Sequence, residues 1–304
     1  MRNSIYSKPI NPVAVVTGAN KGIGLEVVRQ LALHGVTVVL TARDQGRGTR
    51  AVDSLKLPNV LFHQLDVRDP GGPPALADFL TARFGSLDIL VNNAGHGGVT
   101  TDVEGLKALN IDPRQWLSGG AADLVRGVIK QDYEGAVACI DINYFGCKRV
   151  TEALLPLLQL SSWGATIVNV SSLRSELRRI PGERIRKELG EMEGLSEERI
   201  EEVLRRFLED MKRGDLDGGG WCLMLPAYSI SKAALNAYTR VLAARHPAMR
   251  INCVHPGYVD TDINWHTGIL TVSEGARGPV ALAMLPAGGP SGCYYDQTTL
   301  ASFF

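Results

Sequence analysis

Tyr228 and Lys232, near the end of the chain, have the types and the spacing that proton transfer requires. Residues four apart share one face of a helix, so the ammonium group would stand one turn from the phenol. A nearby positive charge favours the phenolate and should lower the pKa of the phenol from its usual value of about 10. We therefore predict that Tyr228 is a general acid and base whose pKa is tuned by Lys232. Alone, the pair is modest evidence, because a Tyr and a Lys at helical spacing usually mark a solvated helix face or the edge of a core.

A glycine-rich turn lies far earlier in the chain, directly after the apolar run Val13 to Val16. Glycines let the backbone turn tightly and approach a pyrophosphate at the start of a helix, where free N–H groups and the helix dipole favour anions. Such turns are common, so this one is modest evidence by itself. Combined with the Tyr and Lys pair, it predicts a dinucleotide site with contacts at Gly18, Asn20, Lys21, Gly22, Ile23 and Gly24.

The glycine spacing, Gly-x-x-x-Gly-x-Gly, resembles that of the short-chain dehydrogenases/reductases and differs from Gly-x-Gly-x-x-Gly. Further motifs stand in the order that this family uses, and the resemblance covers roughly residues 13 to 300. These motifs are Leu65-Asp66-Val67, Asn92-Asn93-Ala94-Gly95, Asn143, the run Ile167 to Ser172, and the run His255 to Thr261.

Six short apolar runs rich in β-branched residues are typical of parallel strands that are buried on both faces. Helical stretches separate them, which predicts strand, helix and strand units. We predict an α/β fold, a doubly wound parallel sheet of the Rossmann type, as one domain over residues 13–304 after a loose polar tail at residues 1–12. The runs are Val13–Val16, Val36–Leu40, Val60–Phe62, Ile89–Val91, Ile167–Val170 and Ile251–Val254.

Two arginines, Arg43 and Arg47, follow the second of these runs. NAD-selecting folds place an acid there, whereas a guanidinium can grip a ribose phosphate in bidentate fashion. Lys21 could add a second charge, although all three are also compatible with ordinary surface positions. We predict NADPH/NADP+ as the cofactor. The family resemblance implies further cofactor contacts at Asp66, Val67, Asn92, Ala94, Gly95, Tyr228, Lys232, Pro256, Gly257, Val259 and Thr261, whereas a structural role is at least as well supported for Asn93.

Two serines, Ser171 and Ser172, end the run Ile167–Val170. Side chains alternate along a strand, so one of the two should face the pocket. The resemblance favours Ser172, which would hydrogen-bond the substrate oxygen. It also gives Asn143 the role of an asparagine that kinks a helix and holds a water linking Lys232 to solvent. The predicted reaction is the reversible, NADPH-dependent reduction of a ketone or aldehyde to an alcohol.

Several short sequence segments, including Val38 to Asp44 and Phe62 to Val67, resemble those of the carbonyl-reductase-like branch of the family. Asn236 to Ala243 and Gly292 to Asp296 resemble plant reductases of the salutaridine reductase and neomenthol dehydrogenase type. This resemblance implies plant secondary metabolism, an apolar terpenoid- or alkaloid-like carbonyl substrate and a monomer. Related enzymes reduce a carbon–carbon double bond with Glu in place of the Tyr, so a double-bond reductase remains an alternative, as does a non-catalytic NADP-binding regulatory protein.

Two segments, at about 96–134 and 173–225, are longer than the connections that compact members of this family need between their strands and helices. The first bears glycines and helix breakers, and we expect an inserted loop. The second contains a helix that Ser196 should cap and Gly214 should end. We expect its apolar stripe to pack on the protein's own core, to cover the surface through which compact relatives pair, and to wall the substrate pocket. The stripe is Ile200, Val203, Leu204, Phe207, Leu208 and Met211. The charge run Glu183 to Glu188 should be a solvated helix face.

Composition narrows the remaining possibilities. The 304 residues include 32 acidic and 32 basic ones, so no global charge favours nucleic acid or an anionic membrane. The 5 cysteines are odd in number and scattered, which fits reduced thiols in a cytoplasmic protein. The spacing of His96, His255 and His266 supports neither a metal site nor a triad, and for His255 we expect a structural role.

Overall fold

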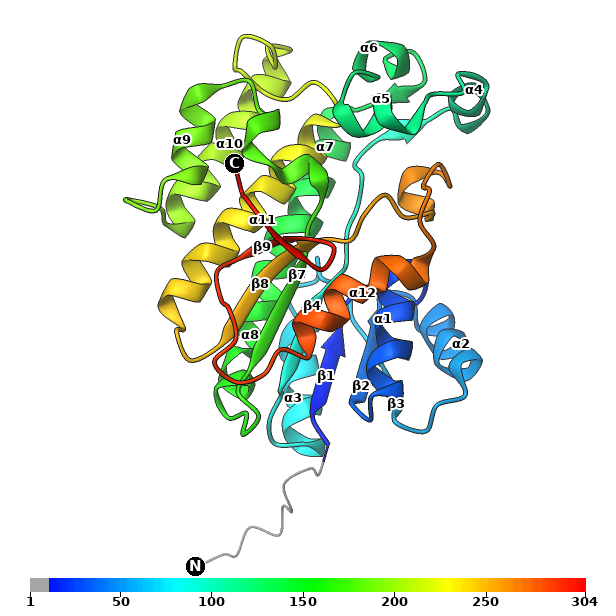
Figure 1. The fold of residues 1–304 in the computed structure, drawn as a ribbon, viewed down its shortest axis with the longest axis vertical. Helices are drawn as coiled ribbons and strands as arrows, with labels where there is room; N and C mark the ends of the chain where they lie inside the picture. The colour runs from blue at the N-terminus through cyan, green and yellow to red at the C-terminus, as the bar shows by residue number, and fades with distance from the viewer. Residues whose placement is uncertain (1–10) are drawn as a thin grey trace, which may run out of the picture.

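A sheet with the strand order β10-β9-β8-β7-β4-β1-β2-β3 runs through the protein (Figure 1). A computed structural model describes residues 11–304, so most of the tail predicted at residues 1–12 lies outside the described residues. The pairs are parallel except for β9 and β10, which confirms the predicted doubly wound sheet. The strands are β1 (Val13–Val16), β2 (Thr37–Ala42), β3 (Val60–Gln64), β4 (Ile89–Asn92), β7 (Thr166–Val170), β8 (Arg250–His255), β9 (Tyr294–Asp296) and β10 (Thr299–Ala301).

Helices cover both faces of the sheet (Figure 1). They are α1 (Gly22–Leu33), α2 (Gln45–Leu55), α3 (Gly72–Arg83), α4 (Val103–Ala108), α5 (Pro113–Ser118), α6 (Ala122–Val125), α7 (Tyr133–Ile140), α8 (Cys147–Gln159), α9 (Glu183–Gly190), α10 (Glu197–Arg213), α11 (Pro226–Arg245) and α12 (Val272–Ala283). Alternate residues of β1 show the layering. Val13 and Val15 join the core beneath α3, α7, α8 and α11, whereas Ala14 and Val16 join the core beneath α1 and α12.

The order of the strands reverses between β1 and β4. The loops that follow these two strands therefore diverge at the carboxyl edge of the sheet and leave a crevice between them, which is where open α/β sheets bind ligands. The fold thus places the glycine-rich turn after β1 and the Asn93 segment after β4 on the two sides of that crevice.

The segment at about 96–134 is not the irregular loop that its glycines and prolines suggested. It forms α4, α5 and α6 and a small antiparallel ladder of β5 (Thr100–Thr101) with β6 (Ile129–Lys130). Asp102 and Asp112 cap α4 and α5 with their side chains. Leu106, Trp116 and Val125 are buried in a third hydrophobic cluster, which they share with Met224 of the second insertion.

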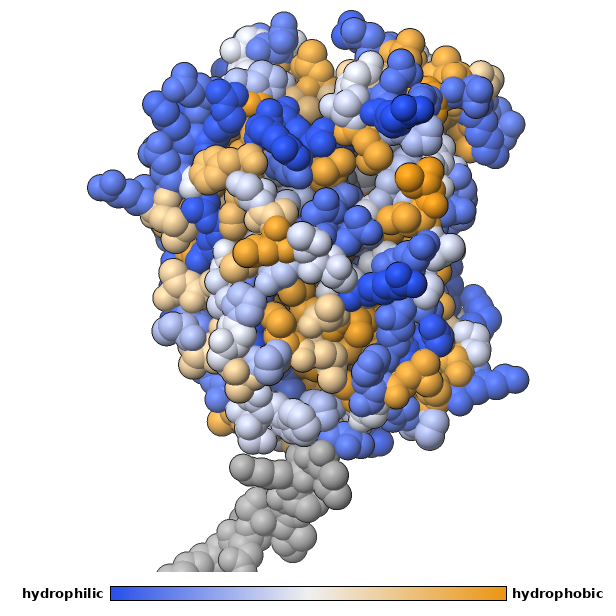
Figure 2. Space-filling model, in the orientation of Figure 1, coloured by the Kyte–Doolittle hydropathy of each residue, from blue (hydrophilic) through white to orange (hydrophobic). Residues whose placement is uncertain are grey.

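The segment at about 173–225 confirms the predicted helix. The Ser196 hydroxyl accepts a hydrogen bond from the Arg199 N–H at the start of α10, and Gly214 ends the helix in the left-handed conformation. Phe207 and its apolar neighbours on α10 are buried against the core that α11 and α7 share. The expectation that the stripe packs on the protein's own core is therefore confirmed. The outer surface over α9 is largely hydrophilic (Figure 2).

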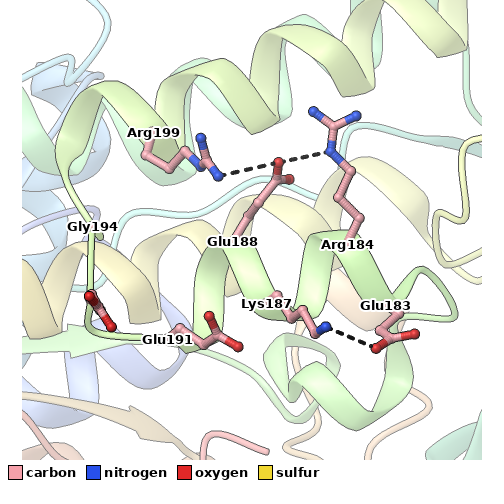
Figure 3. Close-up of a pocket in the computed structure, with 8 residues that line it drawn as sticks. Glu183, Arg184, Lys187, Glu188, Glu191, Gly194 and Arg199 are labelled. Atoms are coloured by element: carbon pink, nitrogen blue, oxygen red, sulfur yellow. Dashed lines mark hydrogen bonds and ion pairs between the residues drawn. The ribbon is translucent and has the colours of Figure 1, made fainter.

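The charge run on α9 is not simply a solvated face. The side chain of Glu188 is only 6% exposed and is paired with Arg206. Figure 3 shows its two further pairs, with Arg184 and Arg199. These arginines come from α9 and α10, and the pairing lowers the pKa of Glu188 even though burial acts in the opposite direction. A surface hollow of about 660 Å³ at this junction is lined by the same ion pairs. The charges join the two helices of the insertion to each other.

Replacing Phe207 by Ala tests what holds α10 in place. Phe207 is fully buried, with its ring edge-to-face on Trp221 at 5.2 Å between centroids. We expect the free energy of unfolding in urea to fall by about 3 to 5 kcal/mol. Arg205→Ala, on the exposed side of the same helix, should change it by less than about 1 kcal/mol. Equal stability of the two variants would contradict the packing described here.

Candidate active site

A cavity of about 690 Å³ opens at the carboxyl edge of the sheet, where the loops after β1, β2, β4, β7 and β8 converge. Nearly all the residues that the sequence nominated line this cavity. They are Gly18, Asn20, Lys21, Gly22, Ile23, Gly24, Arg43, Arg47, Asp66, Val67, Ala94, Gly95, Ser172, Tyr228, Lys232, Pro256, Gly257, Val259 and Thr261. Segments more than two hundred residues apart in the sequence therefore meet in one site.

The glycine-rich turn has the geometry of a phosphate cradle. Gly18 and Gly22 have φ of +61° and +59°, a region that favours glycine. A Cβ at Gly18 would lie 2.8 Å from the Cα of Ala94, so the turn also needs the missing side chain. The first N–H groups of α1 receive no side-chain cap from Lys21. Free N–H groups at a helix start, reached by bare backbone, fit the pyrophosphate of a dinucleotide.

The turn after β2 favours a cofactor that carries a 2′-phosphate. Arg43 and Arg47 line this end of the cavity. The carboxylate of Asp44, which could take the ribose-binding role of an NAD-selecting acid, instead accepts the Arg47 N–H at 2.7 Å and caps α2. The ammonium of Lys21 is paired with Asp262 across the cavity, so its charge is already partly balanced.

Asn92 is not among the residues that line the cavity, so its predicted contact with the cofactor stays a prediction. Its side chain lies inside the protein, 5% exposed, and donates to Thr151 Oγ1 at 3.0 Å and to Asn169 Oδ1 at 2.9 Å. Asn92 ends β4, and its side chain points between β7 and α8 rather than into the cavity. Asn93, in contrast, donates to the carbonyls of Thr17 and Gly18 at 2.9 and 3.2 Å, in the structural role that was left open for it.

The two serines after β7 point in different directions, as strand alternation requires. The Ser171 hydroxyl is buried and donates to Asn236 Oδ1 of α11 at 2.6 Å. The Ser172 hydroxyl accepts the Arg174 N–H at 3.1 Å, and Ser172 lines the cavity together with Tyr228. The geometry favours Ser172 as the serine that meets the substrate. Ser171 and Asn236 position α11, and the spacing of Asn236 four residues after Lys232 was a signal that sequence reasoning missed.

The direction predicted for the pKa of Tyr228 was wrong for the protein by itself. Burial raises the pKa of Tyr228 to about 12, while the neighbouring Ser172 hydroxyl and the charge of Arg174 act to lower it. The Lys232 ammonium lies 5.9 Å from the centre of the Tyr228 ring and donates to the Val170 carbonyl at 2.7 Å. Desolvation of the phenol therefore outweighs its neighbours, and Tyr228 is held as the protonated acid at neutral pH.

Asn143 supports the cavity from behind. It lies in a π-helical turn, Asp141–Gly146, between α7 and α8, which agrees with the predicted distortion of a helix. Its amide nitrogen donates to the His96 carbonyl at 3.0 Å and to Ser231 Oγ at 2.9 Å, and its oxygen accepts the His96 N–H at 2.8 Å. Asn143 thus joins the loop after β4 to the helix that carries Tyr228, but it is not among the residues that line the cavity.

One wall of the cavity comes from residues that sequence reasoning missed. Trp116 and Leu117 of the first insertion line it together with Tyr258 and Trp265. The Trp116 ring stacks on Tyr258 at 6.4 Å and meets Trp265 edge-on at 6.2 Å. The second insertion contributes only its ends, Leu173, Arg174 and Leu225, so the expectation that its inner residues wall the pocket was wrong.

His255, for which a structural role was expected, also lines the cavity. It ends β8 and is 7% exposed, and burial lowers its pKa to about 4, so the imidazole is neutral. Its Nδ1 has no hydrogen-bond partner among the described residues.

Within residues 11–304 no helix has the length and apolarity needed to cross a bilayer.

The burial of Lys232 predicts how the stability of the protein depends on pH. Desolvation lowers the pKa of Lys232 to about 8, so the unfolded chain, with an ordinary Lys pKa of about 10.4, binds more protons between these pH values. The stability of the unmodified protein relative to Lys232→Met should therefore rise from pH 8 to pH 10, by up to about 3 kcal/mol. Urea unfolding of both proteins without cofactor measures this difference. A difference that stays constant over this range would show that Lys232 is not desolvated.

Comparisons with known proteins agree with the geometry. A family model described as short chain dehydrogenase matches residues 12–116 and 220–268. The chain is 47% identical over 298 residues to (+)-neomenthol dehydrogenase of Arabidopsis thaliana, covering 95% of this chain and 97% of the relative. It is 34% identical over 298 residues to carbonyl reductase (NADPH) 1 of Bos taurus, covering 94% and 96%. The structure of salutaridine reductase from Papaver somniferum superposes with a TM-score of 0.88 at 44% identity, covering 94% of this chain and 99% of that one. The chain belongs to the short-chain dehydrogenase/reductase family.

Proposed function

We propose that this protein is an NADPH-dependent reductase that converts a ketone or aldehyde to an alcohol, reversibly. The observation that carries the proposal is that Ser172, Tyr228 and Lys232 line the same cavity as the glycine-rich turn. A bovine relative is named for NADPH, and Arg43 and Arg47 stand where a ribose phosphate would need them. Proton donor and dinucleotide cradle therefore share one crevice.

The residues of the chain divide the work of carbonyl reduction. NADPH, when bound, supplies the hydride that the carbonyl carbon accepts. The Ser172 hydroxyl holds the carbonyl oxygen, and Tyr228 transfers its phenolic proton to that oxygen, which completes the alcohol. The raised pKa of Tyr228 keeps this proton in place at neutral pH. Lys232, buried beside the phenol, supplies a positive charge that stabilises the phenolate left behind.

The substrate class follows from the relatives and from the wall of the cavity. The names of two relatives refer to neomenthol and salutaridine, which points to a terpenoid- or alkaloid-like carbonyl compound here. Trp116, Leu117, Tyr258 and Trp265 supply a largely apolar and aromatic lining, which suits the apolar body of such a molecule.

Two alternatives are less well supported. A double-bond reductase of the same branch would carry Glu at the catalytic position, but Tyr228 stands there and faces the cavity. A non-catalytic NADP-binding regulatory protein has no need for Ser172, Tyr228 and Lys232 to line one cavity together. Consumption of NADPH with a panel of cyclic ketones would separate both alternatives from the proposal.

The proposal extends to organisation and assembly. We treat residues 13–304 as a single domain with insertions at about 96–134 and 173–225. Because α10 packs over α7 and α11, the surface through which compact relatives pair is covered, and this supports a monomer. The five free cysteines are compatible with a reducing, cytoplasmic location.

Replacing Tyr228 by Phe removes the proton and keeps the ring. We expect the turnover number to fall by ~10²-fold or more while the dissociation constant for NADPH changes little. Tyr258→Phe is a matched control, because its phenol lines the same cavity but is bonded to Thr267. The control should keep turnover within about tenfold. Near-normal turnover of Tyr228→Phe would place the acid elsewhere.

Replacing Arg43 by Glu tests the choice of cofactor. The loss of a charge-assisted contact to the 2′-phosphate should weaken NADPH binding by about 1.5 to 3 kcal/mol, and NADH binding much less. Arg50→Glu makes the same change of charge on the exposed face of α2 and should leave the ratio of the two affinities nearly unaltered. Equal weakening of NADPH and NADH by Arg43→Glu would contradict the assignment.

A further inference from the structure

Arg174 is a buried cation on the substrate side of the cavity. It lies in the short 3-10 turn Leu173–Ser175 directly after Ser172, and only 7% of the residue is exposed. It lines the cavity with Tyr228 and Tyr258, and its charge acts on both phenols to lower their pKa values. A guanidinium stays protonated under all ordinary conditions. The wall next to the proposed reaction centre therefore carries a fixed positive charge.

No carboxylate among residues 11–304 lies within ion-pair distance of Arg174. Of its five N–H donors, one is used within this part of the chain, in a hydrogen bond to the Trp116 carbonyl. The nearby carboxylate of Glu176 is buried and already bonded to Arg178 and Arg179. Buried charges in proteins are normally paired, because an unpaired one is costly to desolvate. Arg174 departs from that rule at the edge of a cavity.

The carboxylates that line the cavity do not compensate. Asp44 caps α2, and Asp66 accepts the Arg68 N–H at 3.0 Å, and both follow strands on the cofactor side of the cavity. Asp260 and Asp262 are engaged by His266, and Asp262 also by Lys21. Lys232 adds a second cation. The buried His255 is neutral at neutral pH. The substrate side of the cavity is therefore positively charged as well as aromatic.

The cofactor phosphates do not account for this charge. The cradle follows β1, whereas Arg174 follows β7, and β4 lies between them in the sheet. Neighbouring strands lie ≈ 4.7–4.9 Å apart, so these loops begin roughly 10 Å from each other. Arg43, Arg47 and Lys21 already serve the phosphate end. The remaining donors of Arg174 are left for a ligand at the substrate end.

We propose that the substrate carries a carboxylate in addition to its carbonyl group and that Arg174 binds it. The inference rests on the proposed reductase function and makes its substrate class more specific: an apolar ring body with one anionic group near the reacting carbonyl. The planar guanidinium matches a carboxylate with two parallel N–H donors, and in a buried site such a pair is strong. The aromatic wall of Trp116 and Tyr258 holds the apolar body beside it.

Arg179 provides a control that distinguishes substrate binding by Arg174 from a purely structural role. Arg179 also donates to carbonyls at the end of α5, those of Leu117 and Ser118 at 2.8 and 3.2 Å, but it does not line the cavity. If Arg174 serves only to hold α5, then Arg179→Gln should reproduce the effects of changing Arg174. If Arg174 binds the substrate, the two variants should differ.

The experiment measures equilibrium binding to the NADP+ complex by calorimetry, with cyclohexanecarboxylate and its neutral isostere cyclohexanecarboxamide as probes. The unmodified protein should bind the carboxylate at least about 10-fold more tightly than the amide. Arg174→Met should weaken the carboxylate by about 10- to 100-fold and change the amide little. Arg179→Gln should keep the preference. Arg174→Lys keeps the positive charge but loses the planar guanidinium, so it should keep part of the preference for the carboxylate over the amide. This variant tests the inference if Arg174→Met does not fold.

Three outcomes would overturn the inference: equal affinity of the unmodified protein for the two probes, equal weakening of both by Arg174→Met, or loss of the preference in Arg179→Gln. A parallel assay of NADPH consumption compares 4-oxocyclohexanecarboxylate with its ethyl ester. A protein that prefers the carboxylate probe but reduces no ketone would contradict the reductase function and leave the anion site standing. Reduction of both ketones with equal kcat/KM, and no preference in binding, would contradict the anion site alone.

Discussion

The close approach of Gly18 to Ala94 is the constraint on which the site depends. A Cβ at Gly18 would lie 2.8 Å from the Ala94 Cα, so the turn after β1 rests directly on the loop after β4. Hydrogen bonds fix the contact, since Thr17 Oγ1 accepts from the N–H groups of Asn93 and Ala94 at 3.0 Å each. The two loops diverge only beyond this point, and the cavity begins where they part. Its position therefore follows from one glycine and a reversal of strand order.

A second set of contacts holds the catalytic helix against the sheet. Asn236 accepts from Ser171 at 2.6 Å and donates to Ser175 at 2.8 Å, and Asn169 donates to Thr239 at 2.9 Å. All these side chains are buried, and a satisfied polar network in an apolar interior admits few alternative arrangements. Asn236 lies one turn after Lys232 and two turns after Tyr228, so the face that anchors α11 is also the face that carries the chemistry.

Local patterns predicted most of the sheet, because parallel strands are short β-branched runs and six of them were visible in the sequence. The strands β9 and β10 lack such a run, and they pair at the edge, where burial demands less. Asn92 shows a different limit: its family motif is present, but its side chain points into the core. The pKa of Tyr228 shows a third limit of prediction from sequence. The spacing reveals the cation one turn away, but the desolvation that raises the pKa depends on residues that only folding brings together. The buried Glu188 was missed for the same reason, since its partners Arg199 and Arg206 lie on another helix.

The two insertions divide the remaining work. The second packs α10 on the main core, and its inner residues stay away from the cavity. The first insertion is buried in a smaller hydrophobic cluster around Trp116, to which Met224 of the second insertion also belongs. It also contacts the rest of the protein through Arg174, Arg179 and the aromatic rings of Tyr258 and Trp265. This cluster is distinct from the two main cores on the faces of the sheet, so we expect changes in the cavity-facing side chains of the first insertion to affect the packing on the sheet little. We therefore expect substrate choice to depend on the elements that are least constrained by the sheet, and hydride and proton transfer to depend on those that are most constrained by it.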